Sequence, residues 1–414
     1  MKRSILAVIL CFAGMAVHAQ DMSYYTREFK STDSSFKERL TLLETVRDAG
    51  LSGLGEFYHE ALKHFLLKFP DIRTNDEWTD AENSARILCN GLGEEKYTAA
   101  APALWETADI YDVGRPRFDR GKIDGLIMQD ALIALGNVDG KDFSPHIIER
   151  LSRFNSQTFT DQETRRFAQR GVVGCVKALE AMGDPAGYRP VFFVYVGSYD
   201  PAIRLDIAYN ALPSILDDPG EVISEIIIDP SSDPRIKLEA WKEMLKSKAS
   251  GSSKAKTASV ALATSFVYNT SNRVFQTNLK DMRKSAIDTI RENGVPDDSV
   301  YPNIEKAYNT AFTTASPDYE EIQKILDALR TIKSEEAVGL LLKFLQELHG
   351  RRRSNTWGTM ERNVFERVVY AIGATGTQDI NVRLLLTNIR GSSNYTSAEQ
   401  RMAANALTAL GVTR

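Results

Sequence analysis

The sequence predicts an all-α protein, an α-α superhelix in which helical hairpins stack into a solenoid. The first observation is a repeated phrase, in which an apolar helical run closes on glycine and a short turn leads into another apolar run. It occurs at 131–136, 178–183 and 369–373. The second observation is the spacing of apolar residues, which has the helical period in every periodic segment. Only 191–196 has the β-branched and aromatic residues that favour a strand.

A second phrase supports the same fold. Ser198–Asp206 and Ser231–Glu239 share the pattern Ser-x-Asp-Pro-x-Ile-[Arg/Lys]-Leu-[Asp/Glu], 33 residues apart. Ser or Asp caps a helix, Pro fits the first turn where a backbone N–H needs no partner, and Ile and Leu face the core. The phrase therefore predicts two helix starts in equivalent positions.

The first residues predict export. Lys2 and Arg3 precede an almost wholly apolar run, 5–17, and Val17-His18-Ala19 is a small-x-small cleavage site. Residues 1–19 are thus a predicted signal peptide, and we expect a periplasmic or extracellular protein. The run is too short to span a membrane comfortably, and no later run approaches 18 apolar residues, so no membrane span is expected. Residues 20–35 are polar with scattered aromatic residues, which predicts a flexible N-terminal segment.

Residues 36–246 are the predicted N-terminal helical repeats. Glycines after residue 49, Pro70 and the pair Gly91 and Gly93 interrupt the apolar runs and mark helix ends. The helices expected before the second phrase are 36–46, 57–69, 80–92, 97–110, 126–135, 143–154, 165–182 and 188–196.

Residues 247–256, Ser-Lys-Ala-Ser-Gly-Ser-Ser-Lys-Ala-Lys, have the composition of a linker or insertion loop. The predicted C-terminal helical repeats, 257–414, follow. An apolar stripe with helical spacing, typical of a buried face, runs through Ile322, Ile325, Leu326, Leu329 and Ile332. Residues 349–360 are a predicted polar loop. The helices expected here are 258–268, 274–290, 300–312, 322–332, 337–348, 364–372, 382–389 and 398–410.

Both phrases resemble HEAT repeats. The resemblance rests on Ala-Leu-x-Ala-[Leu/Met]-Gly-[Asp/Asn] before a short turn, and on the Asp-Pro-x-Ile-[Arg/Lys] openings. It touches most of 36–414, but the offsets between phrases vary, so the array is degenerate. The resemblance implies a curved right-handed stack whose second helices line a concave surface, and such a surface typically binds another protein.

The net charge and the positions of the cysteines limit which partners the protein can bind and whether its thiols can form a disulfide. The chain has 51 basic and 55 acidic residues, and loss of Lys2 and Arg3 with the signal leaves a balance of −6. This balance disfavours nucleic acid as a partner. Cys89 and Cys175 lie about two hairpins apart, whereas a disulfide needs Cα atoms within about 7 Å. We expect two buried free thiols.

Motifs for catalysis, metals and cofactors are missing from the sequence. His59 and His64 are spaced i, i+5, so the two imidazoles point about 140° apart and cannot form the zinc-protease pair. Asn137, Asp139 and Asp142 share a turn without the EF-hand frame. No nucleophile elbow or phosphate-binding loop occurs in the printed sequence. We therefore expect no catalytic residue, no metal and no cofactor.

Two sets of residues are candidates for binding a partner protein. The first is an aromatic helix face, with core packing between hairpins as the favoured alternative: Tyr188, Phe192, Tyr195 and Tyr199. The second is a basic loop beside Trp357, formed by Arg351, Arg352 and Arg353. Because adjacent arginines repel without an anionic neighbour, this loop suggests an acidic partner, although a solvated loop is the simpler interpretation. A further basic loop carries Arg115, Arg117, Arg120 and Lys122.

The sequence thus predicts an exported, non-enzymatic scaffold or adaptor that binds another protein through a curved helical-repeat surface. Two alternatives stay open. One is a structural subunit of an envelope or appendage assembly, and the other is a hydrolase or lyase built on an α-helical toroid.

Overall fold

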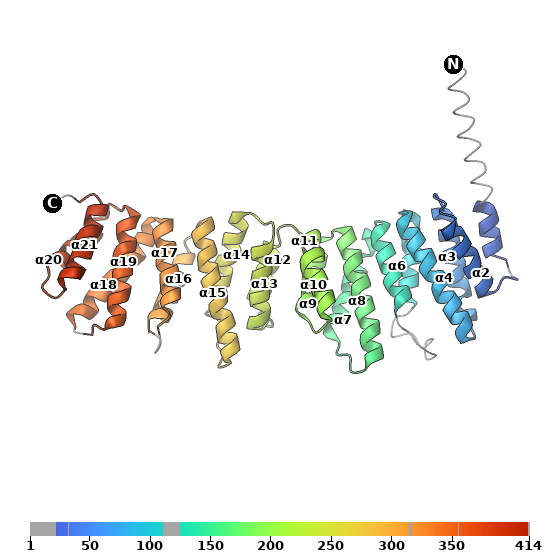
Figure 1. Ribbon diagram of the computed structural model, residues 1–414, viewed down its shortest axis with the longest axis horizontal. Coiled ribbons are helices and arrows are strands. Elements are labelled where there is room, and N and C mark those ends of the chain that lie inside the picture. The colour runs from blue at the N-terminus through green and yellow to red at the C-terminus, as the bar shows by residue number, and fades with distance from the viewer. Residues whose placement is uncertain (1–21, 32, 111–124, 314–316, 355, 413–414) are drawn as a thin grey trace, which may run out of the picture. The chain divides into compact units, whose positions relative to one another are not determined.

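The computed structural model describes residues 22–412 except 32, 111–124, 314–316 and 355. Within these ranges all regular structure is helical, with no strand, which confirms the all-α fold of stacked helical hairpins (Figure 1). Even 191–196, with its strand-like composition, lies in a helix. The chain divides into two compact units, unit 1 up to Asp217 and unit 2 from Asp218. The predicted signal peptide, 1–19, lies outside the described residues.

Unit 1 opens with a helix at 22–29, and its later helices match the runs expected before residue 197. They are α2 (Phe36–Asp48), α3 (Gly55–Lys68), η1 (Phe69–Asp71), α4 (Asn75–Glu94), η2 (Thr98–Ala100), α5 (Ala101–Asp109), α6 (Leu126–Asn137), η3 (Lys141–Phe143), α7 (Ser144–Ser156), α8 (Gln162–Met182), η4 (Pro185–Gly187), α9 (Tyr188–Val196), α10 (Pro201–Asp206), η5 (Ile207–Ala211) and α11 (Leu212–Ile215).

Unit 2 consists of longer helices joined by short turns. They are α12 (Gly220–Ile228), α13 (Pro234–Lys246), α14 (Gly251–Thr264), α15 (Arg273–Asn293), α16 (Val300–Thr313), α17 (Tyr319–Ile332), α18 (Glu335–Arg353), α19 (Thr359–Thr375), α20 (Ile380–Gly391) and α21 (Ser397–Ala409).

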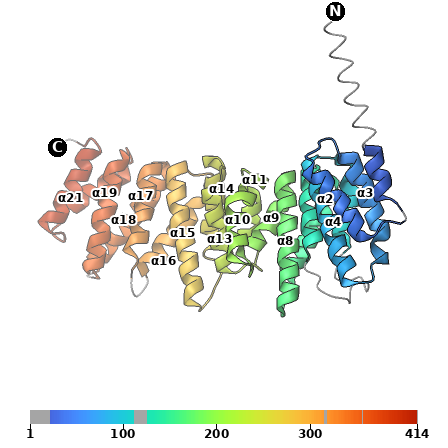
Figure 2. The ribbon, with the colours of Figure 1, turned by 45° about the vertical axis from the view of Figure 1, so that its right-hand side comes forward.

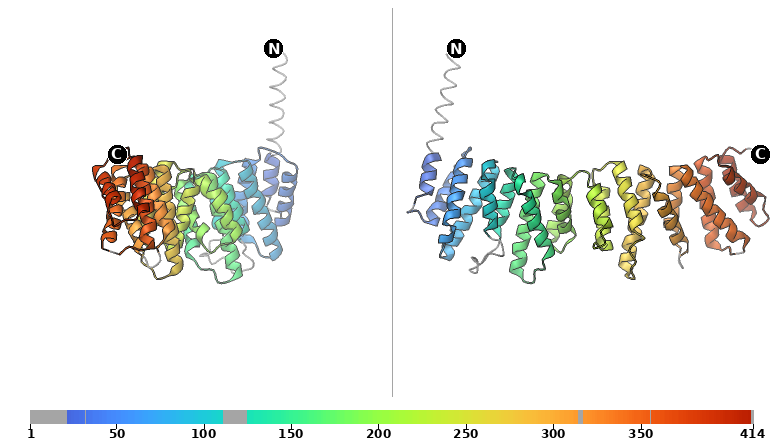
Figure 3. Two further views of the ribbon diagram at one scale, coloured as in Figure 1. Left: turned by 60° about the vertical axis from the view of Figure 1, so that its left-hand side comes forward. Right: turned by 180° about the vertical axis from the view of Figure 1, so that it is seen from behind.

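Each unit has two layers of helices (Figure 2). In unit 1, α2, α4, α6 and α8 pack side by side as a first layer, and α3, α5, α7 and α9 form the second. In unit 2 the first layer runs α13, α15, α17, α19 and α21, and the second runs α12, α14, α16, α18 and α20. The long helices α8 and α15 extend beyond their neighbours within their units (Figure 3). Apolar side chains between the layers form the core, including the predicted stripe from Ile322 to Leu329.

The Asp-Pro phrase starts two helices, as predicted, but the two copies then diverge. Asp200 accepts a hydrogen bond from the Ala202 N–H (2.8 Å), and Asp233 accepts one from the Ile236 N–H (2.9 Å). The second copy continues as the unbroken α13. The first passes into the π-helical turn η5, because Pro213 cannot donate the backbone hydrogen bond that a regular α-helix needs.

The glycines of the first phrase have different roles. Gly183 ends α8 in the left-handed conformation (φ 61°), as the phrase predicts. Gly136 instead lies where α6 meets α8, and a Cβ atom there would be 2.7 Å from the Ala178 Cα. Gly373 has the same role between α19 and α21, against the Ala406 Cα at 3.1 Å. These two glycines permit close helix packing, and the interpretation of them as helix stops is wrong.

Two predicted boundaries are also wrong. The N-terminal segment 20–35 is not uniformly flexible, because 22–29 is helical and Phe29 is buried. Arg39 holds this segment, since its guanidinium donates to the carbonyl oxygens of Phe29 (3.0 Å) and Ser31 (3.0 Å). Of the supposed linker, 247–256, only 247–250 lie between helices. Residues 251–256 form the start of α14, because Ser, Ala and Lys are tolerated in a helix and Ser250 caps it. The unit boundary lies instead at 217/218.

Two further expectations concern thiols and the membrane. Cys89 and Cys175 are buried free cysteines, as expected, and burial raises the pKa of Cys175 to about 12. The pKa of Cys89 is raised for the same reason. Across the described ranges, no helix combines the length and the apolar character that crossing a bilayer requires.

Candidate partner-binding surfaces

Arg351, Arg352 and Arg353 form the last turn of α18, not a loop. The predicted loop over 349–360 is therefore reduced to the residues between α18 and α19. Arginine suits this position, because the carbonyl end of a helix carries partial negative charge. Glu347, one turn earlier, adds an ion pair of 2.9 Å between its Oε1 and the Arg351 Nη2.

Arg351 and Arg352 already have anionic neighbours within the chain. Arg351 also lies 3.4 Å from Glu361, with its guanidinium 4.5 Å from the centre of the Phe312 ring. Arg352 Nη2 lies 3.4 Å from Glu399 Oε2. Two of the three arginines predicted to need an acidic partner are therefore already paired, contrary to that prediction, and Arg353 alone is exposed.

The surroundings of Arg352 form an aromatic cage. Its guanidinium carbon lies 5.0 Å from the Trp357 ring centre and 5.6 Å from that of Tyr395, and these rings are nearly perpendicular (84°). Its Nε donates to the Asn394 carbonyl oxygen (2.6 Å). Trp357, a predicted partner-binding residue, is therefore engaged by an arginine of its own chain.

Buried glutamates in the first layer of unit 2 share a recurring ion pair with arginine, which the sequence analysis did not predict. Glu321, Glu361 and Glu399 are buried, and each lies in the first turn of its helix, three residues after the N-cap. Each pairs with an arginine that also stacks on an aromatic ring; the arginines are Arg283, Arg351 and Arg352. The available signal was the capping box Thr-x-x-Glu at 396–399. The pattern does not reveal burial, since Glu77 in the same pattern is only half-buried.

The predicted aromatic face is mostly core. Tyr188 and Phe192 are buried, and Tyr195 is half-buried. Because α9 ends at Val196, Tyr199 lies beyond the helix, where its hydroxyl donates to Asn155 Oδ1 (3.2 Å). Burial raises the pKa of Tyr199 to about 12. The four residues therefore do not form a surface, and the core alternative is confirmed for Tyr188 and Phe192.

The remaining sequence candidates add no site. Arg115, Arg117, Arg120 and Lys122 lie outside the described residues. Burial lowers the pKa of both His59 and His64. In the part of the chain that the structure describes, no three His, Cys, Asp or Glu side chains are placed to hold a metal ion.

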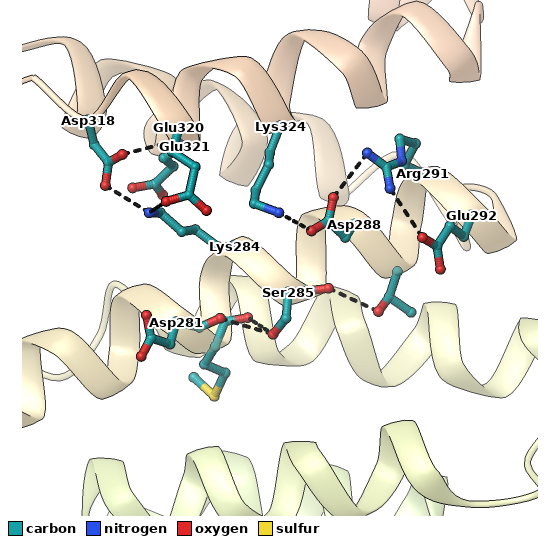
Figure 4. Close-up of polar contacts among 12 residues, drawn as sticks. Asp281, Lys284, Ser285, Asp288, Arg291, Glu292, Asp318, Glu320, Glu321 and Lys324 are labelled. Atoms are coloured by element: carbon teal, nitrogen blue, oxygen red, sulfur yellow. Dashed lines mark hydrogen bonds and ion pairs between the residues drawn. The ribbon is translucent and has the colours of Figure 1, made fainter.

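Charged side chains join α15 to α17 along a line that we call the α15–α17 seam (Figure 4). Lys284 Nζ lies 3.1 Å from Asp318 Oδ2 and 2.7 Å from Glu320 Oε2, and Lys324 pairs with Asp288. Beneath them, Arg283 Nη2 donates to Glu321 Oε2 (2.9 Å) within the core. Cations of α15 face anions of α17 at one end of the seam, and Asp288 with Lys324 reverses this order. The charges neutralise one another, so the seam favours one register of the two helices.

The α14–α15 turn exposes apolar side chains. Val267 is 80% exposed and Val274 is 65% exposed. Next to them the Tyr268 and Phe275 rings meet with their centres 6.4 Å apart. Phe266 anchors the turn, because its ring lies 4.8 Å from Lys306 Nζ. Between Ser265 and Asn278 the sequence has one charged residue, Arg273.

Comparison with known proteins leaves the family open. No family model and no curated protein matches the chain. Among solved structures, human deoxyhypusine hydroxylase in complex with glycerol is similar at 14% sequence identity over 96% of this chain and 98% of that chain, with a TM-score of 0.24. A TM-score this low carries no argument about activity.

Proposed function

We propose that the protein is an exported, non-enzymatic scaffold that binds another protein along its helical repeats, which we regard as HEAT-like. The observation that carries the proposal is the α14–α15 turn. Two valines with most of their surface in water, beside a pair of aromatic rings, form an apolar cluster of the kind that marks protein–protein contacts. Support for export comes from the signal-peptide pattern of 1–19.

Site-specific crosslinking tests the proposal in the exported fraction of the native host. A photoreactive residue replaces Val267 in one variant and Lys242, an exposed residue of α13, in the control. We expect a discrete protein adduct at position 267 that is lost in Val274→Asp, and none at position 242. Equal adducts at both positions, or none at 267, would refute the proposal.

A further inference from the structure

Three aromatic rings meet at the surface between α5 and α7 in unit 1. The Trp105 and Phe143 rings are stacked, with centres 5.8 Å apart and an angle of 27°. The His146 ring lies 5.6 Å from Trp105 and 6.4 Å from Phe143. Trp105 and Phe143 are half-buried and His146 is exposed. We call these residues the α5–α7 ring cluster.

A buried arginine holds the cluster in place from below. The guanidinium carbon of Arg150 lies 4.4 Å from the Trp105 ring centre. Arg150 donates to the Ala108 carbonyl oxygen (3.1 Å) and to Asp109 Oδ1 (2.8 Å), so both helices are tied to it. The rings therefore form a fixed platform, and a ligand would not need to order them.

Three exposed carboxylates lie next to the ring residues in the sequence or one helical turn away. Glu106 follows Trp105, Asp142 precedes Phe143, and Glu149 lies one helical turn after His146. Among the residues that the structure describes, none of the three takes part in an ion pair. The neighbouring cation, Lys141, lies 3.2 Å from Asp139 instead. Within the described residues, these carboxylates therefore present uncompensated negative charge near the aromatic rings.

In unit 2, a similar combination of aromatic rings and a carboxylate binds an arginine side chain. There Trp357 and Tyr395 with Glu399 enclose the guanidinium of Arg352. A cation over an aromatic ring is attracted to the negative face of the ring, and a carboxylate beside it adds a charge-assisted hydrogen bond. In unit 1, Arg150 and Asp109 fill this role beneath Trp105. On the outer side, the exposed carboxylates near Phe143 and His146 have no ion-pair partner among the described residues.

We infer that the α5–α7 ring cluster is the docking site for a basic segment of a partner protein. An arginine or lysine side chain of that segment stacks on Phe143 and His146 and pairs with Glu106, Asp142 or Glu149. The inference rests on the proposed function and specifies the charge of the partner, which is opposite to that suggested by Arg351–Arg353.

Binding of a defined peptide tests the site on the full mature chain. The probes are octa-arginine, octa-lysine and octa-glutamate, titrated by calorimetry in low salt. The variant Glu106→Gln/Asp142→Asn/Glu149→Gln is compared with Glu335→Gln/Glu336→Gln/Glu366→Gln, which removes three exposed carboxylates from unit 2. We expect the first variant to raise the octa-arginine Kd roughly tenfold and the second less than about twofold. Equal losses in the two variants, or tighter binding of octa-glutamate, would overturn the inference.

A second readout separates ring stacking from bulk charge. His146→Ala leaves the three carboxylates in place and should weaken octa-arginine about threefold while changing octa-lysine less, because guanidinium stacks better on rings. No change for either peptide would exclude the ring platform. Crosslinking at Val267 distinguishes the two proposals. An adduct at position 267, combined with unchanged octa-arginine affinity in the variant at 106, 142 and 149, refutes only the basic docking site. Site-dependent peptide binding without any adduct refutes only the scaffold function.

Discussion

The α6–α8 contact of unit 1 and the α15–α17 seam of unit 2 join neighbouring helices of the same layer by different chemistry. In unit 1 the helices approach through small residues: a Cβ at Gly136 would meet the Ala178 Cα, and one at Gly174 would lie 3.0 Å from the Gln129 Cα. In unit 2, Lys284, Arg283 and their carboxylate partners occupy the equivalent space. Substitutions that add volume should destabilise the α6–α8 contact, and substitutions that change charge should not. At the α15–α17 seam, charge changes should be the destabilising ones.

The largest effect is expected where the apolar core under the seam is broken. Leu329 of α17 is fully buried. Leu329→Asp should cost roughly 4 kcal/mol or more, because the carboxylate has no partner there. Hydrogen exchange should show lost protection over α15–α18 and retained protection in α6 and α8, since helical repeats contact only their neighbours. The control, Val274→Asp at an exposed position, should exchange like wild type. Uniform loss across both units would show that they unfold together.

Next comes the buried ion pair. Glu321→Gln leaves the Arg283 guanidinium in the core without its counter-charge and should cost about 3 kcal/mol. The matched control is Glu77→Gln, which occupies the same position after an N-cap in unit 1 but is only half-buried, and it should cost less than about 1 kcal/mol. Urea denaturation measures both. Similar costs for the two variants would mean that burial of Glu321 contributes nothing.

The periodicity of apolar residues was sufficient to predict where the helices lie, but it did not predict the contacts between them. Apolar spacing located α2 to α9 and the stripe of α17, because burial of one helix face requires that spacing. It did not show that Gly136 mediates packing and Gly183 a helix end, since both follow the same phrase and differ only in what a neighbouring helix places against them. Three consecutive arginines looked unpaired because Glu361 and Glu399 are distant in the sequence. The sequence did not indicate the contact between Trp105 and His146 either, because these two residues are also distant in the sequence.

The pH dependence of the seam distinguishes it from the α6–α8 contact. Burial alone would raise the pKa of Asp318, but Lys280, the Glu321 N–H and Lys284 together lower it to about 2. A depressed folded-state pKa stabilises the protein above about pH 4, and this stabilisation is lost as pH falls toward 2. Asp318→Asn keeps a good N-cap and removes the charge, so it should cost roughly 2 kcal/mol at pH 7 and much less near pH 2. A cost that does not change with pH would assign the role of Asp318 to capping alone.

The smallest expected effect tests the volume side of the comparison with a single methyl group. Gly136→Ala places its Cβ against the Ala178 backbone, which cannot move aside, and should destabilise unit 1 by roughly 1 to 2 kcal/mol. Gly339 of α18 offers the matched control, because it is an exposed helical glycine with nothing within 4 Å of an added Cβ. Gly339→Ala should therefore stabilise unit 2 by about 0.5 to 1 kcal/mol through helix propensity alone. If thermal melts show that Gly136→Ala loses stability while Gly339→Ala gains it, close helix packing requires glycine at position 136. If both variants gained stability, α6 and α8 would have room to separate, and the small-residue contact would not determine their spacing.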